Sequence, residues 1–133
     1  DQQCGSYLSV HNYFRSLRVY PDRAVPPRAF VISEFGGITF NVPDHRSLDS
    51  DYGYDSFVNI DDWRAAVKYV IDCADAQEPN GLIGYVFTQL TDVEEETNGL
   101  LTYARVVNKM EYDASEADVE PDAMAEEDTA NEE

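Results

Sequence analysis

Glu34 is the residue of this sequence whose setting points most directly to chemistry. It follows an apolar run at residues 29–33 (AFVIS) and precedes Gly36 and Gly37. A near-continuous apolar run that ends at glycines is typical of a central strand in a parallel sheet. Active sites of α/β proteins lie at the carboxyl ends of such strands. Position alone leaves two interpretations open, a functional carboxylate and a surface carboxylate that bonds to its own loop.

Three further segments are predicted to be regular elements around that strand. Residues 7–10 (YLSV) and 82–90 (LIGYVFTQL) are strand-like, and residues 41–58 form a polar, aromatic-rich loop. Asn59 is a good N-cap for a helix with two aspartates in its first turn. That helix has one apolar stripe, made of Trp63, Ala66, Val67, Val70, Ile71 and Ala74. The order strand, helix, strand predicts a βαβ unit of parallel strands, preceded by the strand at residues 7–10.

The chain is expected to divide into a body at residues 1–110 and a tail at residues 111–133. The tail holds eleven of the 27 acidic residues, and no Lys or Arg follows Lys109. Its few apolar groups cannot offset the entropy of ordering the chain, so we expect a disordered acidic tail. In the body, about three parallel strands and one long helix leave faces and edges of the sheet uncovered. The body is therefore expected to be an incomplete α/β domain.

Charge and composition exclude several classes of function. The formal net charge is −18, and the body alone has sixteen acids against nine bases, so nucleic acid is not an expected partner. No run approaches the about 18 consecutive apolar residues of a membrane span, so no membrane partner is expected. The two cysteines, Cys4 and Cys73, lack the spacing of a zinc or redox motif. Neither a metal nor another cofactor is expected, because no phosphate-binding, dinucleotide-binding or His-Glu-x-x-His motif occurs.

Two segments resemble a known family of enzymes. Residues 31–38 (VISEFGGI) and residues 84–103 (GYVFTQLTDVEEETNGLLTY) resemble the last two strands of glycoside hydrolase family 2, the β-galactosidase and β-glucuronidase family. The spacing between them, the loop at residues 52–54 and the acidic start of the helix are also similar, so the resemblance covers roughly residues 7–108. It implies that the body is the C-terminal portion of a (β/α)₈ TIM barrel, comprising about its last three strands.

The resemblance also implies a role for Glu34. In this family the seventh strand of the barrel ends in a catalytic glutamate, and the matching position here is Glu34. Its role would be nucleophilic attack on the anomeric carbon of a β-glycoside, with net retention of configuration. The family takes its acid/base residue from an Asn-Glu pair on the fourth strand, which this chain lacks. Glu94, Glu95 and Glu96 match a loop of the family, so we expect the isolated chain to be inactive.

Residues near Glu34 are candidates for binding a carbohydrate substrate. His11 and Tyr13 resemble a His-Asp-Tyr stretch of the family, in which the tyrosine hydroxyl can bond the nucleophile, although Asn12 stands where Asp is usual. Aromatic rings stack on sugar rings and polar side chains bond sugar hydroxyls. The further candidates are Tyr52, Tyr54, Phe87, Gln89 and Asp92. Ordinary packing at the rim or in the core is the alternative for each of them, and Phe87 replaces a Trp of other family branches.

Two functions from different classes remain open at this point. The first is a fragment of a retaining glycoside hydrolase that acts in carbohydrate metabolism. The second is a non-catalytic barrel fragment that serves as an interaction or assembly module. Assembly is a third alternative, since exposed strand edges could pair with a separate chain that supplies the missing N-terminal portion of the barrel.

Overall fold

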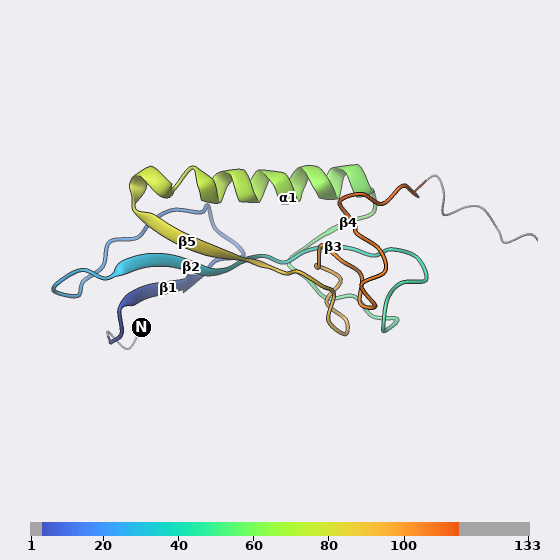
Figure 1. The fold of residues 1–133 in the computed structure, drawn as a ribbon, viewed down its shortest axis with the longest axis horizontal. Coiled ribbons are helices and arrows are strands. Elements are labelled where there is room, and N and C mark those ends of the chain that lie inside the picture. Colours follow the sequence, from blue (N-terminus) through green and yellow to red (C-terminus); the bar gives the residue numbers. More distant parts are fainter. Residues whose placement is uncertain (1–3, 115–133) are drawn as a thin grey trace, which may run out of the picture.

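A parallel three-stranded sheet forms the main body of the molecule (Figure 1). The structure is a computed structural model and describes residues 4–114. Strands β1 (Tyr7–His11), β2 (Ala29–Gly36) and β5 (Leu82–Thr88) lie in the order β1-β2-β5, and both neighbouring pairs are parallel. The three strands predicted from the sequence are thus confirmed. The strand that carries Glu34 is the central one.

Helix α1 (Ile60–Asp75) lies along one face of this sheet (Figure 1). It begins as predicted, because the Oδ1 atom of Asn59 accepts hydrogen bonds from the backbone N–H groups of Asp61 and Asp62 at 2.8 and 3.1 Å. The C-terminal part of its apolar stripe packs on this sheet through the buried Ala74, whereas the buried Trp63 and Val67 pack against residues 38–42. A short 3₁₀ turn, η1 (Glu78–Asn80), then leads into β5. Among residues 4–114 no helix has both the length and the apolarity needed to cross a membrane.

A second, two-stranded sheet was not predicted from the sequence. Strands β3 (Ile38–Phe40) and β4 (Asp55–Phe57) pair in parallel, so residues 55–57 are strand and not loop. Each strand has only three residues, too few for an alternating apolar pattern. The pairing brings the loop between residues 41 and 54 back towards the carboxyl end of β2.

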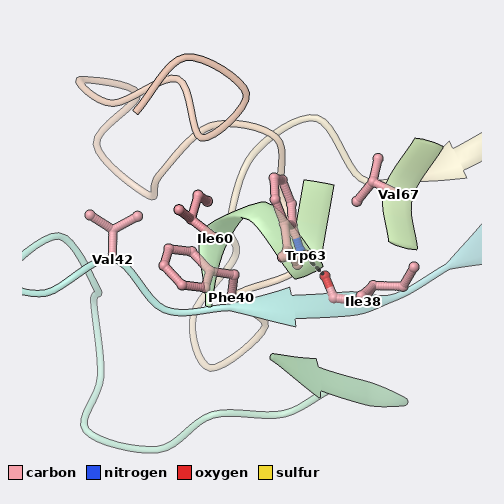
Figure 2. Close-up of a cluster of buried hydrophobic side chains, with 6 residues drawn as sticks. All are labelled: Ile38, Phe40, Val42, Ile60, Trp63 and Val67. Carbon is pink, nitrogen blue, oxygen red and sulfur yellow. Dashed lines mark hydrogen bonds between the residues drawn. The ribbon is translucent and has the colours of Figure 1, made fainter. Parts of the chain in front are cut away.

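Two apolar clusters form the core between α1 and the sheets. Figure 2 shows the first, in which the indole Nε1 of Trp63 donates a 2.9 Å hydrogen bond to the carbonyl oxygen of Ile38. This cluster comprises Ile38, Phe40, Val42, Ile60, Trp63 and Val67. The second cluster comprises Phe30, Ile32, Phe35, Ala74 and Leu82. Burying each large apolar side chain contributes about 1.5–3 kcal/mol to stability, so α1 is held at both ends.

The face of the sheet opposite α1 is open (Figure 1). The side chains of Tyr7, Ile83 and Val86 on β1 and β5 are 58%, 60% and 56% exposed. On β2 only Phe30, Ile32 and Phe35 are buried and the other residues are partly exposed, although a near-continuous apolar run is typical of a strand covered on both faces. Within residues 4–114, the outer edges of β1 and β5 pair with no further strand. Further strands could pair at these edges.

The C-terminal segment of the described chain is attached to the body beyond residue 110. Tyr112 packs against the first apolar cluster, and the guanidinium group of Arg64 donates to the carbonyl oxygens of Lys109 and Tyr112. Residues 111–114 therefore belong with the body, whereas the expected tail was placed from residue 111. The remaining tail, residues 115–133, lies outside the described residues.

Two truncations test this boundary. Deleting residues 115–133 is expected to leave the melting temperature unchanged, because their sequence offers little apolar surface to bury. Deleting residues 111–133 is expected to lower it, because the contacts of Tyr112 with Arg64 and the apolar cluster are lost. Differential scanning calorimetry of the two variants measures both effects. Equal melting temperatures for the two truncations would contradict the assigned boundary.

Candidate active site

The carboxylate of Glu34 is oriented by two side chains, one from the last residue of β1 and one from the loop that follows it. The Tyr13 hydroxyl donates to the Oε2 atom of Glu34 at 2.9 Å, and the Nδ1 atom of His11 lies 3.0 Å from the same oxygen. The parallel register of β1 on β2 sets His11 beside Glu34. The Glu34 side chain is 43% exposed. One oxygen is thus fixed by two partners, and neither of these contacts uses the second oxygen, Oε1.

Tyr13 links the ends of all three strands of the main sheet. Its phenolic oxygen lies 3.1 Å from the Oγ1 atom of Thr88, the last residue of β5. Burial, together with the hydrogen bond and negative charge of Glu34, raises the pKa of Tyr13 to about 12. Its single proton therefore stays on the hydroxyl at neutral pH and is donated to Glu34, while Thr88 can donate to the phenolic oxygen. Thr88 was not predicted, since only its place at a strand end marks it.

Gly37 allows an aromatic pair to lie beside Glu34. The rings of Tyr13 and Tyr54 stack with a centroid distance of 4.1 Å and an interplanar angle of 17°. A Cβ atom at Gly37 would lie 2.5 Å from Tyr54 and 3.1 Å from Tyr13, and its φ of +64° also favours glycine. The glycines after Glu34 thus have a specific steric role. The predicted candidates His11, Tyr13 and Tyr54 come together around Glu34.

Gln89 connects this site to the loop that follows β5. Its Nε2 atom donates to Oε2 of Glu96 at 3.1 Å and to Oδ1 of Asn98 at 2.7 Å. The Nδ2 atom of Asn98 lies 3.3 Å from the same oxygen of Glu96. These bonds tie the amide of Gln89, a predicted substrate-binding residue, into the loop, where it fixes the carboxylate of Glu96.

Two of the predicted candidates have the contacts of structural residues. The ring of Phe87 meets Phe35 edge-on at 5.6 Å and packs against both apolar clusters. Asp92 is only 4% exposed, and its Oδ1 atom lies 2.7 Å from the Nζ atom of Lys109. For Asp92, of the two interpretations that the sequence left open, the structural role accounts for this buried contact. For Phe87 the packing alternative accounts for the observed contacts.

Lys109 anchors the loop after β5 to strand β3. Its fully buried ammonium group donates to Asp92 and to the carbonyl oxygens of Phe40 and Thr97 at 2.7, 2.7 and 2.8 Å. Burial lowers the pKa of Lys109 and raises that of Asp92, and the attraction between the two groups offsets part of each change. The loop that carries Glu96 and Asn98 depends on this anchor for its position.

Comparisons with known proteins add no assignment to this geometry. No protein-family model matches the sequence, and a search of curated proteins returns no match. Among residues 4–114, no group of three or more His, Cys, Asp or Glu side chains is placed to hold a metal ion.

Proposed function

We propose that this chain is the C-terminal part of the (β/α)₈ barrel of a retaining glycoside hydrolase that acts on β-glycosides, with Glu34 as the nucleophile. The observation that carries the proposal is a partly exposed carboxylate on the central parallel strand, with one oxygen held by His11 and Tyr13. The Tyr13 hydroxyl donates to this oxygen and the His11 ring lies beside it, so the carboxylate is turned with its other oxygen available for attack. The resemblance of residues 31–38 and 84–103 to glycoside hydrolase family 2 supports the same reaction.

Each group of the site has a defined task in this reaction. Oε1 of Glu34 bonds to the anomeric carbon as the bond from that carbon to the leaving oxygen breaks, which gives a covalent glycosyl-enzyme. Water then attacks the same carbon, the bond to Glu34 breaks, and the sugar leaves with its original configuration. Throughout, His11 and Tyr13 keep Oε2 in place and compensate its charge as it changes.

The reaction needs a second carboxyl group about 5–5.5 Å from the first, which protonates the leaving oxygen and then activates water. We assign it to the missing N-terminal portion of the barrel, and this chain alone is inactive in our proposal. Within residues 4–114, the outer edges of β1 and β5 are unpaired, and further parallel strands can pair there.

Exchanging Tyr13 for phenylalanine tests the role of its hydroxyl. Tyr13→Phe is expected to lower kcat by about 10²-fold, because the hydroxyl that donates to the nucleophile is lost. Since the pKa of Tyr13 is about 12, the ratio of wild-type to variant rates is expected to stay constant from about pH 5 to 9. Initial rates of both proteins over this pH range measure the ratio. A ratio that changes with pH would instead assign Tyr13 a proton-transfer role.

The second candidate function is a non-catalytic interaction or assembly module, favoured by the same uncovered face of the sheet. The mass of the native protein, detected through a peptide that contains Glu34, separates the two functions. A native mass several times the 15.0 kDa of this chain, together with β-glycosidase activity, supports the enzyme. A mass near 15 kDa without activity supports the module.

A further inference from the structure

Tyr13 reaches Glu34 from a loop and not from a strand, so its position needs a separate explanation. Strand β1 ends at His11, and the Tyr13 hydroxyl nevertheless donates to Glu34 at 2.9 Å. Loops are ordinarily more mobile than the strands that they follow. A displacement of about 1 Å is enough to remove much of the effect of a catalytic contact. The contacts of the loop itself therefore decide how well Tyr13 is placed.

The backbone of Asn12 fixes the start of this loop. The register of β1 on β2 shifts between Val10 and His11. Beyond this irregularity, the N–H group of Asn12 donates to the carbonyl oxygen of Glu34 at 2.9 Å. This bond extends the pairing of the two chain segments by one residue past the end of β1. Because it ends on Glu34, the loop leaves the sheet next to the residue that the Tyr13 hydroxyl must reach.

The side chain of Asn12 closes the same loop. Asn12 is 8% exposed, and its Oδ1 atom accepts a hydrogen bond from the N–H group of Arg15 at 3.1 Å. Its Nδ2 atom donates a longer bond, 3.4 Å, to the carbonyl oxygen of Ser16. Asparagine commonly fixes a turn in this way, with its side chain bonded to the backbone a few residues further on. Both polar ends of the amide are directed to the loop, so this buried side chain is not placed to contact a sugar.

We propose that Asn12 is a positioning residue for the reaction, which holds the Tyr13 hydroxyl on Glu34. This inference rests on the proposed function, in which Tyr13 bonds the nucleophile. One face of the Tyr13 ring is covered by Tyr54, stacked at 4.1 Å. The stacked ring restricts the tilt of Tyr13, and the bonds of Asn12 restrict the backbone that carries it. Together they favour the position in which the hydroxyl lies 2.9 Å from Oε2 of Glu34.

Three variants of the full-length protein that contains this chain test the role of Asn12. Asn12→Ala is expected to lower kcat about tenfold and to leave KM nearly unchanged, because the Tyr13 hydroxyl is displaced while the sugar contacts remain. Asn12→Ser keeps an acceptor for the N–H group of Arg15 and is expected to recover most of this loss. Asn80→Ala is the control, since Asn80 lies in η1 before the start of β5 and its amide donates to Gln77 at 3.2 Å. It is expected to change neither constant.

A double-mutant cycle separates positioning from a general loss of structure. If Asn12 acts through the Tyr13 hydroxyl, Asn12→Ala causes no further loss of kcat in Tyr13→Phe, where this hydroxyl is absent. Losses that multiply would overturn the inference, because Asn12 would then act independently of Tyr13. If Asn12→Ala does not fold, Arg15→Pro removes the N–H group that bonds Asn12, at an exposed residue, and the same cycle applies to it.

A spectroscopic readout makes the inference independent of turnover. In protein that contains fluorotyrosine, the fluorine NMR signal of Tyr13 is assigned by its loss in Tyr13→Phe. Glu34→Gln is expected to shift this signal, because the group that accepts from Tyr13 loses its charge. In Asn12→Ala the same exchange is expected to shift it much less.

The NMR and kinetic results can separate this inference from the proposed function. A full shift of the Tyr13 signal in Asn12→Ala would overturn the positioning role and leave the hydrolase intact. A shift that is lost in Asn12→Ala, in a protein that hydrolyses no β-glycoside, would support the positioning role and refute the proposed reaction.

Discussion

Glu34→Gln is expected to lower the turnover of β-glycosides by the full-length protein about 10⁴-fold or more, and to leave its melting temperature unchanged. The amide has nearly the shape of the carboxylate but cannot form the covalent glycosyl-enzyme. The side chain is 43% exposed at the end of β2, so this exchange leaves the apolar clusters intact. Steady-state rates and calorimetry measure the two properties. Substantial remaining hydrolysis would contradict the role of Glu34.

Glu34→Ala extends this test to the chemistry of attack. Removing the side chain leaves a space beside the anomeric carbon, and a small external nucleophile such as azide can enter it. Azide is expected to restore turnover of an activated β-glycoside and to give the α-glycosyl azide, because attack now occurs once, with inversion. His11→Ala is a matched control, since it alters the same site and keeps the nucleophile. If azide restored the turnover of His11→Ala, or if Glu34→Ala gave a β-configured product, the assignment of Glu34 as the nucleophile would be contradicted.

Lys109→Met is expected to destabilise the protein by about 3–5 kcal/mol, because it leaves the carboxylate of Asp92 buried without its cation. It also removes the hydrogen bonds to the carbonyl oxygens of Phe40 and Thr97. Chemical denaturation measures the change in the free energy of unfolding. Activity is expected to fall as well, since the loop that carries Glu96 loses its attachment to β3.

Lys68→Met is the control for this exchange. Lys68 pairs with Asp72 on the exposed face of α1, with 71% and 58% of the two side chains exposed. Such a surface pair contributes about 0.3–0.5 kcal/mol to the free energy of unfolding. The double variant Lys109→Met/Asp92→Leu removes both buried charges and is expected to recover part of the lost stability. A cost for Lys109→Met no larger than that for Lys68→Met would contradict the anchoring role.

The elements that the sequence predicts correctly are those whose signals are local. The cap at Asn59 and the spacing of apolar residues after it specify α1 within a few turns of chain. The apolar runs likewise mark β1, β2 and β5. The β3–β4 pair has no such signal, because it joins residues 38–40 to residues 55–57 and its stability comes from tertiary contacts. For the same reason, the attachment of Tyr112 to the body was missed.

The same contrast between local sequence signals and tertiary contacts applies to the residues of the candidate site. Glu34 is marked by its strand and its glycines. The register of β1 on β2 brings His11 to it, and Tyr13 reaches it from the loop that follows β1. Phe87 lies in a run in which nearly every residue is apolar, so the sequence does not indicate which face it takes. Irregularities in the β2–β5 register shift the alternation of side chains between the two faces of the sheet. The ring of Phe87 therefore packs against the core. From the sequence alone, Lys109 is expected at the surface. It is buried because its ammonium group bonds acceptors from distant segments, the carbonyl oxygen of Phe40 and the carboxylate of Asp92.

Covalent trapping of the nucleophile tests the central claim most directly. The full-length protein is incubated with 2-deoxy-2-fluoro β-glycosides that carry good leaving groups, in a panel of gluco, galacto and manno configurations. The fluorine slows hydrolysis of the glycosyl-enzyme, so the sugar remains attached long enough for peptide mass spectrometry. We predict loss of activity with one sugar per active site, attached to Glu34. Attachment to another residue, or hydrolysis that gives an inverted product without any trapped sugar, would contradict the proposal.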